Sequence, residues 1–387
     1  MATATFPEVR SRFFSRQEIA AVRRPLNLAS FLPPRIYSDD AIFDFEKAAM
    51  FRRSWLPFCH VSQLPQAGSY VARQLFDESL IALRGGDGAL NVFSNVCRHR
   101  NAALTLPGIG RCKGKRISCP YHGWTYDLDG RLIAAPFMDR TDDFHKGEIT
   151  LPRVRFEIWH GFIFVNFDDQ APGLLGQLKP LEPKVAPYRF EDMVAIEFRR
   201  ATVNWNWKIS LENFSEAYHQ PFIHPQTFDG QFPATLATYD DVEGPYGMFW
   251  MHQKNGEIPP FLVPPVEGMP DEYYRAYSVV NVYPLLHLFM DASIPLWMDW
   301  NILGKDRHEL IWYMLVPASR LANADAQQLK ARFQEIMEPI LLEDVGVCEA
   351  VGAGVRSALA RAGRISHMEK TVWQFHNWLL DQYLDQR

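Results

Sequence analysis

The sequence lacks several features that would assign it to common classes of protein. No apolar run reaches the roughly 18 residues that a membrane-spanning helix needs. The net charge of -5 provides no basic surface for nucleic acid or an anionic membrane. Five cysteines among 387 residues are few and odd in number, which is not typical of a disulfide-stapled secreted domain. We therefore expect a soluble, cytoplasmic protein with reduced thiols and with neither nucleic acid nor membrane as a partner.

Aromatic and aliphatic residues, by contrast, are abundant. The chain is 47% hydrophobic and contains 27 Phe and 11 Trp, enough for two buried cores rather than one. Short β-type runs separated by glycine turns between residues 68 and 129 predict a small antiparallel β domain. Helical spacing over residues 40–55 precedes this region, and a proline-rich stretch around residues 180–187 follows it as a linker.

A second, larger domain is predicted after the linker. A strand should lead into a helix at 211–220, and residues 278–316 alternate between apolar and polar as a sheet does. Residues 324–351 predict a long helix or a helix pair bent at Pro339, with Asn323 or Asp325 as its N-cap. The predicted fold class is α+β, with a β domain and an antiparallel sheet covered by helices in a helix-grip-like arrangement. We place an N-terminal arm and helix at 1–45, the β domain at 46–165 and the larger domain at 166–387.

Two short motifs pair cysteine with histidine. Cys97-Arg98-His99 has the form Cys-x-His, and Cys119-Pro120-Tyr121-His122 has the form Cys-x-x-His. In a Rieske [2Fe-2S] centre two thiolates bind one iron and two imidazoles bind the other. A structural zinc site uses the same residue types but pairs Cys with Cys and His with His. The mixed halves therefore favour the cluster over zinc or over simple packing.

A second group of possible ligands lies in the larger domain. Glu216 and His219 are three residues apart and share one face of the expected helix. Pro221 should end that helix, so that His224 folds back beside His219. Two imidazoles and one carboxylate on one side of Fe(II) leave positions open for oxygen. On spacing alone, a zinc hydrolase site or an ordinary surface Glu with buried His remain alternatives.

Three segments resemble a known family. CRHRNAALT, SCPYHGWTYDLDGRL and NWNWKISLENFSEAYHQPFIHP are similar to the cluster loops and iron-binding segment of bacterial Rieske non-haem iron (ring-hydroxylating) oxygenase α subunits. The resemblance implies a [2Fe-2S] cluster bound by Cys97, His99, Cys119 and His122. It also implies a mononuclear Fe(II) at which O2 reacts. Asn101 replaces the usual glycine, but Asn also tolerates a left-handed backbone.

The resemblance also assigns the residues around the mononuclear iron. His219 and His224 would be ligands, while Glu216 would hydrogen-bond an iron ligand and His122 of a neighbouring subunit, and so carry the electron between them. Glu at this position, where Asp is commoner, resembles family members that oxidise carnitine, glycine betaine and similar methylammonium compounds. The third ligand would come from a late helix. Asp344 is the expected ligand, with Glu343 as the nearest alternative.

We expect Asn213 to lie close to the iron, as the corresponding residue often does in relatives. The sequence contains no nucleotide-binding fingerprint in the required strand-to-helix context, because the glycines near residue 110 lead into no helix. Electrons from NAD(P)H should therefore come through a flavin and iron-sulfur reductase, with or without a ferredoxin. The family's bridge between subunits implies a homotrimer, and a β subunit is possible.

The function that follows is that of a terminal oxygenase, an oxidoreductase that hydroxylates or oxidatively demethylates a small aromatic or methylammonium compound. Cis-dihydroxylation of an aromatic ring is the alternative reaction. A Rieske electron carrier and a zinc-binding structural protein are the non-enzymatic alternatives. Aromatic side chains of the second domain should line the pocket as a cage for an ammonium group or as apolar walls for an arene. The strands of that domain carry Phe249, Trp250, Tyr283, Phe289, Trp297 and Trp300, and we expect most of these to be ordinary core residues.

Overall fold

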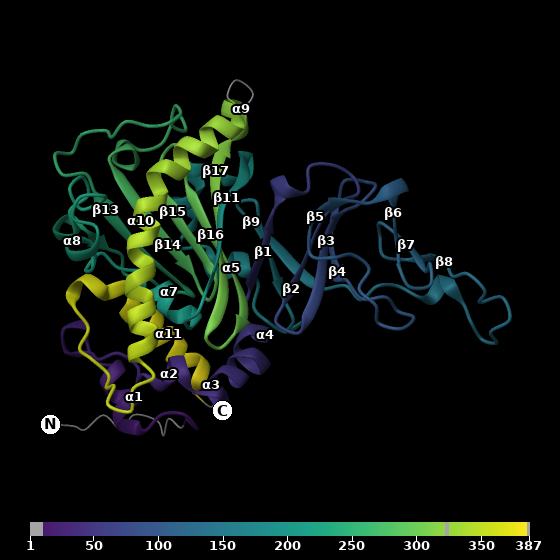
Figure 1. Cartoon of the computed structure of the whole chain (residues 1–387), viewed down its shortest axis with the longest axis horizontal. Helices are drawn as coiled ribbons and strands as arrows, with labels where there is room; N and C mark the ends of the chain where they lie inside the picture. Colours follow the sequence, from purple (N-terminus) through teal and green to yellow (C-terminus); the bar gives the residue numbers. More distant parts are fainter. Residues whose placement is uncertain (1–10, 322–324, 385–387) are drawn as a thin grey trace. The chain divides into compact units, whose positions relative to one another are not determined.

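The computed structural model describes residues 11–321 and 325–384, which fall into two compact units (Figure 1). The smaller unit comprises Arg53–Leu175 and Arg189–Ala195. The larger unit comprises the chain up to Arg52, then Gly176–Tyr188 and everything from Ile196 onward. The boundaries that we placed at residues 45 and 165 compare with divisions at 52 and 175. The first division comes later because residues 40–53 form one continuous helical stretch.

The smaller unit is the predicted antiparallel β domain. Its sheets have the strand orders β4-β3-β2-β5, β6-β7-β8 and β1-β10-β9, and every pairing among them is antiparallel. The strands are β1 (Leu56–His60), β2 (Ser69–Leu75), β3 (Glu78–Arg84), β4 (Leu90–Ser94), β5 (Gly108–Arg111), β6 (Arg116–Ser118), β7 (Thr125–Asp127), β8 (Leu132–Ala134), β9 (Arg155–Trp159) and β10 (Phe162–Asn166). Buried residues of the first two of these sheets and of their loops form a core, which includes Ile81, Phe93, Trp124 and Tyr126.

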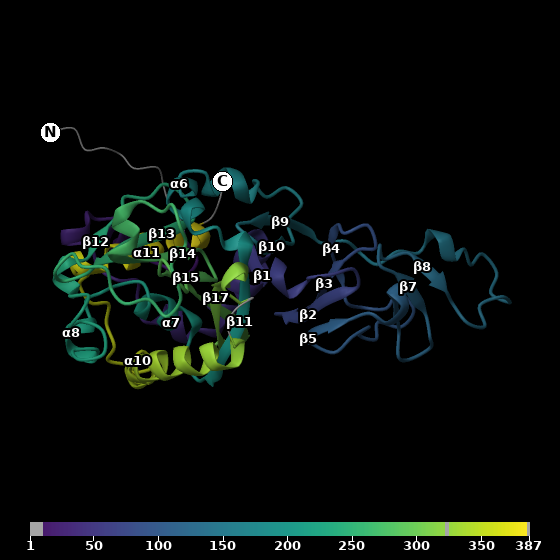
Figure 2. The same cartoon turned by 90° about the horizontal axis from the view of Figure 1, so that it is seen from above.

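The larger unit is built on a seven-stranded sheet of order β11-β17-β16-β15-β14-β13-β12. The strands are β11 (Met193–Val203), β12 (Thr238–Tyr239), β13 (Tyr246–His252), β14 (Ala276–Val282), β15 (Leu286–Met290), β16 (Leu296–Gly304) and β17 (Arg307–Pro317). The long helix α10 (Ala326–Gly354) crosses the sheet, and α7 (Trp207–Asn213) packs against it (Figures 1 and 2). Helix α11 (Lys370–Tyr383) packs against β13. The predicted α+β class is therefore confirmed.

The first helices of the chain are part of the larger unit. They are α1 (Arg16–Val22), α2 (Arg35–Ser38), α3 (Asp40–Phe45), a π-helical turn (Glu46–Met50) and α4 (Phe51–Arg53). Glu46 forms an ion pair of 2.6 Å with Lys208 Nζ, and both side chains are completely buried. Trp207 Nε1 and the hydroxyl of Tyr383 donate to the same carboxylate. One buried acid therefore joins the start of the chain to α7 and to the end of α11.

Two helix predictions need correction. The helix expected at 211–220 ends at Asn213, and residues 214–219 form turns before a short helix α8 (Gln220–Ile223). Pro221 lies in the first turn of α8, so it starts a helix rather than ending one. Proline is tolerated there because the first N–H groups of a helix have no partner within the helix.

The region of the expected linker and the late helix also differ in detail from the predictions. The proline-rich stretch forms short helices, α5 (Leu174–Leu178) and α6 (Glu182–Val185), with Pro183 in the first turn of α6. Helix α10 continues through Pro339 as a single helix, and the Asp325 side chain caps it by accepting from the N–H of Gln327. The alternative cap, Asn323, lies outside the described residues. Among the helices in the described ranges, none is long and apolar enough to cross a bilayer.

Candidate functional site

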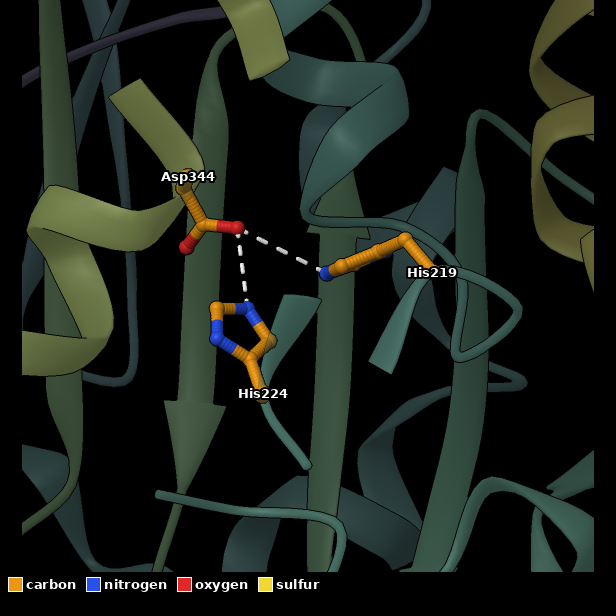
Figure 3. Close-up of side chains that lie close together, drawn as sticks. All are labelled: His219, His224 and Asp344. Atoms are coloured by element: carbon orange, nitrogen blue, oxygen red, sulfur yellow. Dashed lines mark hydrogen bonds and ion pairs between the residues drawn. The ribbon is translucent and has the colours of Figure 1, made fainter. Parts of the chain in front are cut away.

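Three side chains converge in the larger unit, one of them from α10 and two from the ends of α8 (Figure 3). Asp344 Oδ1 lies 3.0 Å from His224 Nε2 and 3.6 Å from His219 Nε2. One possible ligand atom from each residue lies within 4.8 Å of the other two. Two imidazole nitrogens and one carboxylate oxygen on one side of a metal are the donor set of non-haem Fe(II) oxygenases. The residues therefore fit a mononuclear iron.

The short helix α8 positions both histidines. His219 is its N-cap residue and His224 its C-cap residue, so a single helical turn separates them. The N–H of His224 donates to the carbonyl of Gln220 at 2.8 Å, which closes that turn. The two imidazole rings lie with their centroids 5.2 Å apart. The pairing of these rings therefore depends on α8 and on Pro221 at its start.

A carboxylate holds the second nitrogen of each histidine. Glu216 Oε1 lies 2.5 Å from His219 Nδ1, and Glu343 Oε2 lies 2.7 Å from His224 Nδ1. Burial alone would lower the pKa of both histidines, but the neighbouring carboxylates raise it overall. Such partners fix the ring orientation and make the ligand nitrogen more basic. Both Nε2 atoms thus face Asp344, and Glu343 lies behind His224 rather than beside the ligand atoms.

Glu216 and Asn213 contact this group in different ways. The other oxygen of Glu216 accepts from the backbone N–H groups of Tyr218 and His219, so the carboxylate is fixed by its own turn. Asn213 ends α7 and donates from Nδ2 to Asp344 Oδ1 at 2.9 Å. The structure therefore brings together every residue that we expected around the iron. Of these, Glu216 and Asn213 orient a histidine and a carboxylate respectively.

A pocket lies beside the three residues, and few of its walls come from the strand aromatic residues named from the sequence. Among the expected aromatic residues Phe249 and Phe289 line it. Trp250, Tyr283, Trp297 and Trp300 pack against Tyr273, Phe375, Tyr313 and His287 respectively, and all but the half-buried Trp250 are buried, as expected for core residues. The aromatic lining that sequence reasoning missed is Phe214, Phe228, Phe232, Tyr277 and Phe333. Most of these lie on turns or helices, where the alternating pattern of a strand does not apply.

The four residues of the Cys/His motifs lie on two similar loops of the smaller unit. In each loop the residue four after the cysteine has a left-handed backbone and donates its N–H to the cysteine carbonyl. These residues are Asn101, with φ of 56°, and Gly123, with φ of 72°. The prediction that Asn101 supports this turn is therefore confirmed. Cys97 and Cys119 are buried and not in disulfides.

The two histidines of these loops lie at the surface of the smaller unit. The rings of His99 and His122 have centroids 4.6 Å apart, and both residues are exposed. His99 stacks on the buried ring of Trp124 at 4.9 Å. Two buried thiols on one side and two exposed imidazoles on the other match the asymmetric ligand set of a Rieske cluster, in which the thiolates bind one iron and the imidazoles the other. The residues therefore fit the group.

Comparison with known proteins follows the same division. Residues 54–148 match the family model for the Rieske [2Fe-2S] domain. Residues 190–385, half of the chain, match the model for the catalytic domain of the ring hydroxylating alpha subunit.

Curated relatives and a solved structure agree with these matches. The glycine betaine monooxygenase oxygenase subunit of Chromohalobacter salexigens is 35% identical over 214 residues, which is 55% of this chain and 46% of that protein. The carnitine monooxygenase oxygenase subunit of Escherichia coli is 38% identical over 197 residues, 50% of this chain and 52% of that protein. The matched stretch thus spans about half the length of each relative. A structure of the quaternary ammonium Rieske monooxygenase CntA superposes with a TM-score of 0.80 at 23% identity, covering 97% of this chain and 100% of that one.

Proposed function

The chain belongs to the family of ring-hydroxylating oxygenase α subunits, and on that premise we propose that it is a terminal oxygenase that hydroxylates or oxidatively demethylates a small organic substrate. The observation that carries this proposal is the convergence of His219, His224 and Asp344 beside a pocket. When bound there, Fe(II) supplies the redox chemistry that activates O2. Asp344 and the Nε2 atoms of His219 and His224 hold the metal. The aromatic walls of the pocket exclude water from the substrate.

Delivery of electrons is the task of the two Cys/His loops in this proposal. Cys97, His99, Cys119 and His122 hold the cluster, and a reductase, directly or through a ferredoxin, supplies its electrons. The exposure of both histidines supports contact with another protein surface. Glu216 then hydrogen-bonds His122 of a neighbouring copy in a cyclic trimer. Its fixed contact with His219 Nδ1 supports that role, because one end of the bridge is already formed.

The type of reaction is proposed on two grounds. The relatives named as glycine betaine and carnitine monooxygenases favour monooxygenation or loss of a methyl group as formaldehyde. Cis-dihydroxylation of an arene is a second candidate, favoured by the apolar aromatic walls of the pocket. Incubation with a reductase, NADH and a panel of arenes, aryl ethers and methylammonium compounds distinguishes them. A diol indicates the second reaction and formaldehyde the first, while oxygen consumption without product from any compound would contradict both.

Purified protein is expected to be red-brown and to contain about three irons per chain, two of them in the cluster. The measurements are iron and zinc analysis, visible absorption and EPR of the reduced protein. A colourless, zinc-loaded protein would show that the Cys/His loops form a structural zinc site. A coloured protein with about two irons would instead indicate an electron carrier without the mononuclear centre.

Tyr126→Phe is expected to lower the reduction potential of the cluster. The Tyr126 hydroxyl accepts from the N–H of Arg98 at 3.0 Å and lies 3.4 Å from Cys97 Sγ. Its own proton is therefore directed to the sulfur, and hydrogen bonds to cluster sulfurs help to set the potential. Burial, and then the contact with Cys97, raise the pKa of this hydroxyl, so it stays protonated. A redox titration with Tyr121→Phe as control tests this, because Tyr121 lies against the ring of His122 while its hydroxyl accepts from Arg100 rather than facing Cys97. Equal potentials in all three proteins would remove the assigned role.

A further inference from the structure

The charge on the pocket walls restricts the substrate. Among the described residues that line the pocket, none is Lys or Arg, and the carboxylates are Glu216 and Asp344. Both acids already face histidines. Apart from the bound iron, whose charge Asp344 already balances in part, a substrate carboxylate would therefore be buried beside two negative groups with no basic side chain to pair it, which is strongly unfavourable. The walls select against acids and against zwitterions that contain a carboxylate.

The rest of the lining is suited to an apolar body. Phe228 and Phe232 stack with centroids 5.3 Å apart, and Tyr277 meets Phe232 edge-on at 4.8 Å. The aliphatic side chains are Ile294, Leu296, Ile336, Met337, Ile340 and Leu341. The hydroxyl of Tyr277 donates to Asp291, and burial, followed by this contact, raises its pKa, so its proton is not available to an acceptor on a ligand. A planar or ring-sized apolar molecule matches these surfaces.

Outside the metal-binding group, the polar side chains of the lining are the exposed Thr227 and Gln231 and the buried Gln220. Gln220 follows His219 directly, borders the pocket and is 5% exposed. Its amide nitrogen donates to Met251 Sδ at 2.9 Å, a weak acceptor, and its side-chain oxygen has no partner among the described residues. Of the buried side-chain atoms without a partner in the described ranges, this oxygen alone belongs to a residue of the pocket lining. An unpaired buried acceptor is unfavourable, so a bound molecule that donates to it gains affinity.

Resting on the function proposed above, we propose that the substrate has an apolar, ring-sized body, one O–H or N–H donor and no carboxylate, and that Gln220 binds the donor. The terminal torsion of a glutamine side chain has a broad range, so the amide can turn toward the pocket without leaving a rotamer well. Gln220 is the residue after His219, which binds the metal. The hydrogen bond between Gln220 and the substrate donor therefore fixes one end of the substrate next to the metal site. Gln220 is therefore a specificity-determining residue.

Binding measured without turnover tests this proposal. Phenol, anisole, benzoate and glycine betaine are titrated calorimetrically into the iron-loaded protein under anaerobic conditions without reductase. Phenol should bind about tenfold more tightly than anisole, which lacks the donor, while benzoate and glycine betaine should give no detectable heat. Benzoate or glycine betaine binding as tightly as phenol would overturn the charge argument. The result does not depend on catalysis, so absence of oxidised product from every compound would count against the proposed function alone.

Two variants test the role of Gln220 itself. Gln220→Leu and the unbranched Gln220→Met remove the amide, and either should reduce the preference for phenol over anisole to about onefold. Gln226→Leu, in an exposed residue of the turns after α8 that does not line the pocket, should keep the tenfold preference. Retention of iron by each variant verifies that the site is folded. An unchanged preference in a folded Gln220 variant would disprove the assignment.

Discussion

Replacing Asp344 with alanine is expected to release the mononuclear iron while the cluster stays in place. Asp344 is 4% exposed and is the carboxylate that both His Nε2 atoms approach. Loss of a direct ligand should weaken metal binding by more than the roughly 10–100-fold that removal of an outer partner typically causes. Metal analysis should therefore fall from about three irons per chain to about two. The visible spectrum should be unchanged, because the cluster ligands lie in the other unit.

Glu343→Ala is the matched control for this experiment. Glu343 precedes Asp344 on α10 and contacts His224, but at Nδ1 rather than at Nε2. Its loss should weaken iron binding by roughly 10–100-fold, so that the site still fills when iron is in excess. If Glu343→Ala emptied the site and Asp344→Ala did not, the ligand would be Glu343 and the assignment of the carboxylate would be wrong.

Glu216→Gln is expected to reduce steady-state turnover by at least about 10–100-fold while both iron centres stay bound. The amide keeps the size of the side chain but removes the negative charge that faces His219 Nδ1 and, in the proposed trimer, the partner for a neighbouring cluster. Steady-state rates and iron content are the measurements. Glu216→Asp should recover part of the activity, because Asp keeps the negative charge.

A rapid-mixing experiment distinguishes transfer of electrons from simple positioning of His219. In the chemically reduced Glu216→Gln protein, oxidation of the cluster by O2 in the presence of substrate should slow as much as turnover does. Slow turnover with rapid oxidation of the cluster would mean that Glu216 only orients the histidine. Normal turnover of this variant would rule out both roles.

Local motifs gave most of the candidate site. The two Cys/His pairs and the two histidines of residues 216–224 could be found from the sequence, because their ligands lie within a few residues of one another. The prediction of Asp344 depended on family resemblance, since it lies 120 residues beyond His224 and no spacing rule joins them. The contrast between Asp344 and Glu343 required the structure. Adjacent residues on a helix point about 100° apart, and only coordinates show which direction meets Nε2.

The pocket was predicted least well. Most aromatic residues on the strands were expected to be core, and they are, but the alternating pattern does not show which of them border the pocket, because it places a buried face in either case. Phe333 comes from α10, and Phe228 and Phe232 from the loop after α8, where no strand pattern applies. Gln220 could not be predicted, because a glutamine next to a histidine matches no sequence motif. What identifies it is the unpaired oxygen, which only a three-dimensional count of hydrogen bonds can reveal.

The buried ion pair between Glu46 and Lys208 gives the two ends of the chain an influence on the metal site. Lys208 lies on the same helix as Asn213, the residue that steadies Asp344, and Tyr383 donates to Glu46 from the last helix. Loss of Glu46 would leave a cation buried without a counter-ion, a change that typically destabilises a protein by about 3–5 kcal/mol. Local unfolding of either terminal segment would therefore first disturb the end of α7, where Asn213 contacts Asp344. Slow loss of the mononuclear iron would then indicate damage far from the ligands in sequence. Glu46 lies more than 150 residues before His219, and Tyr383 lies almost 40 residues after Asp344.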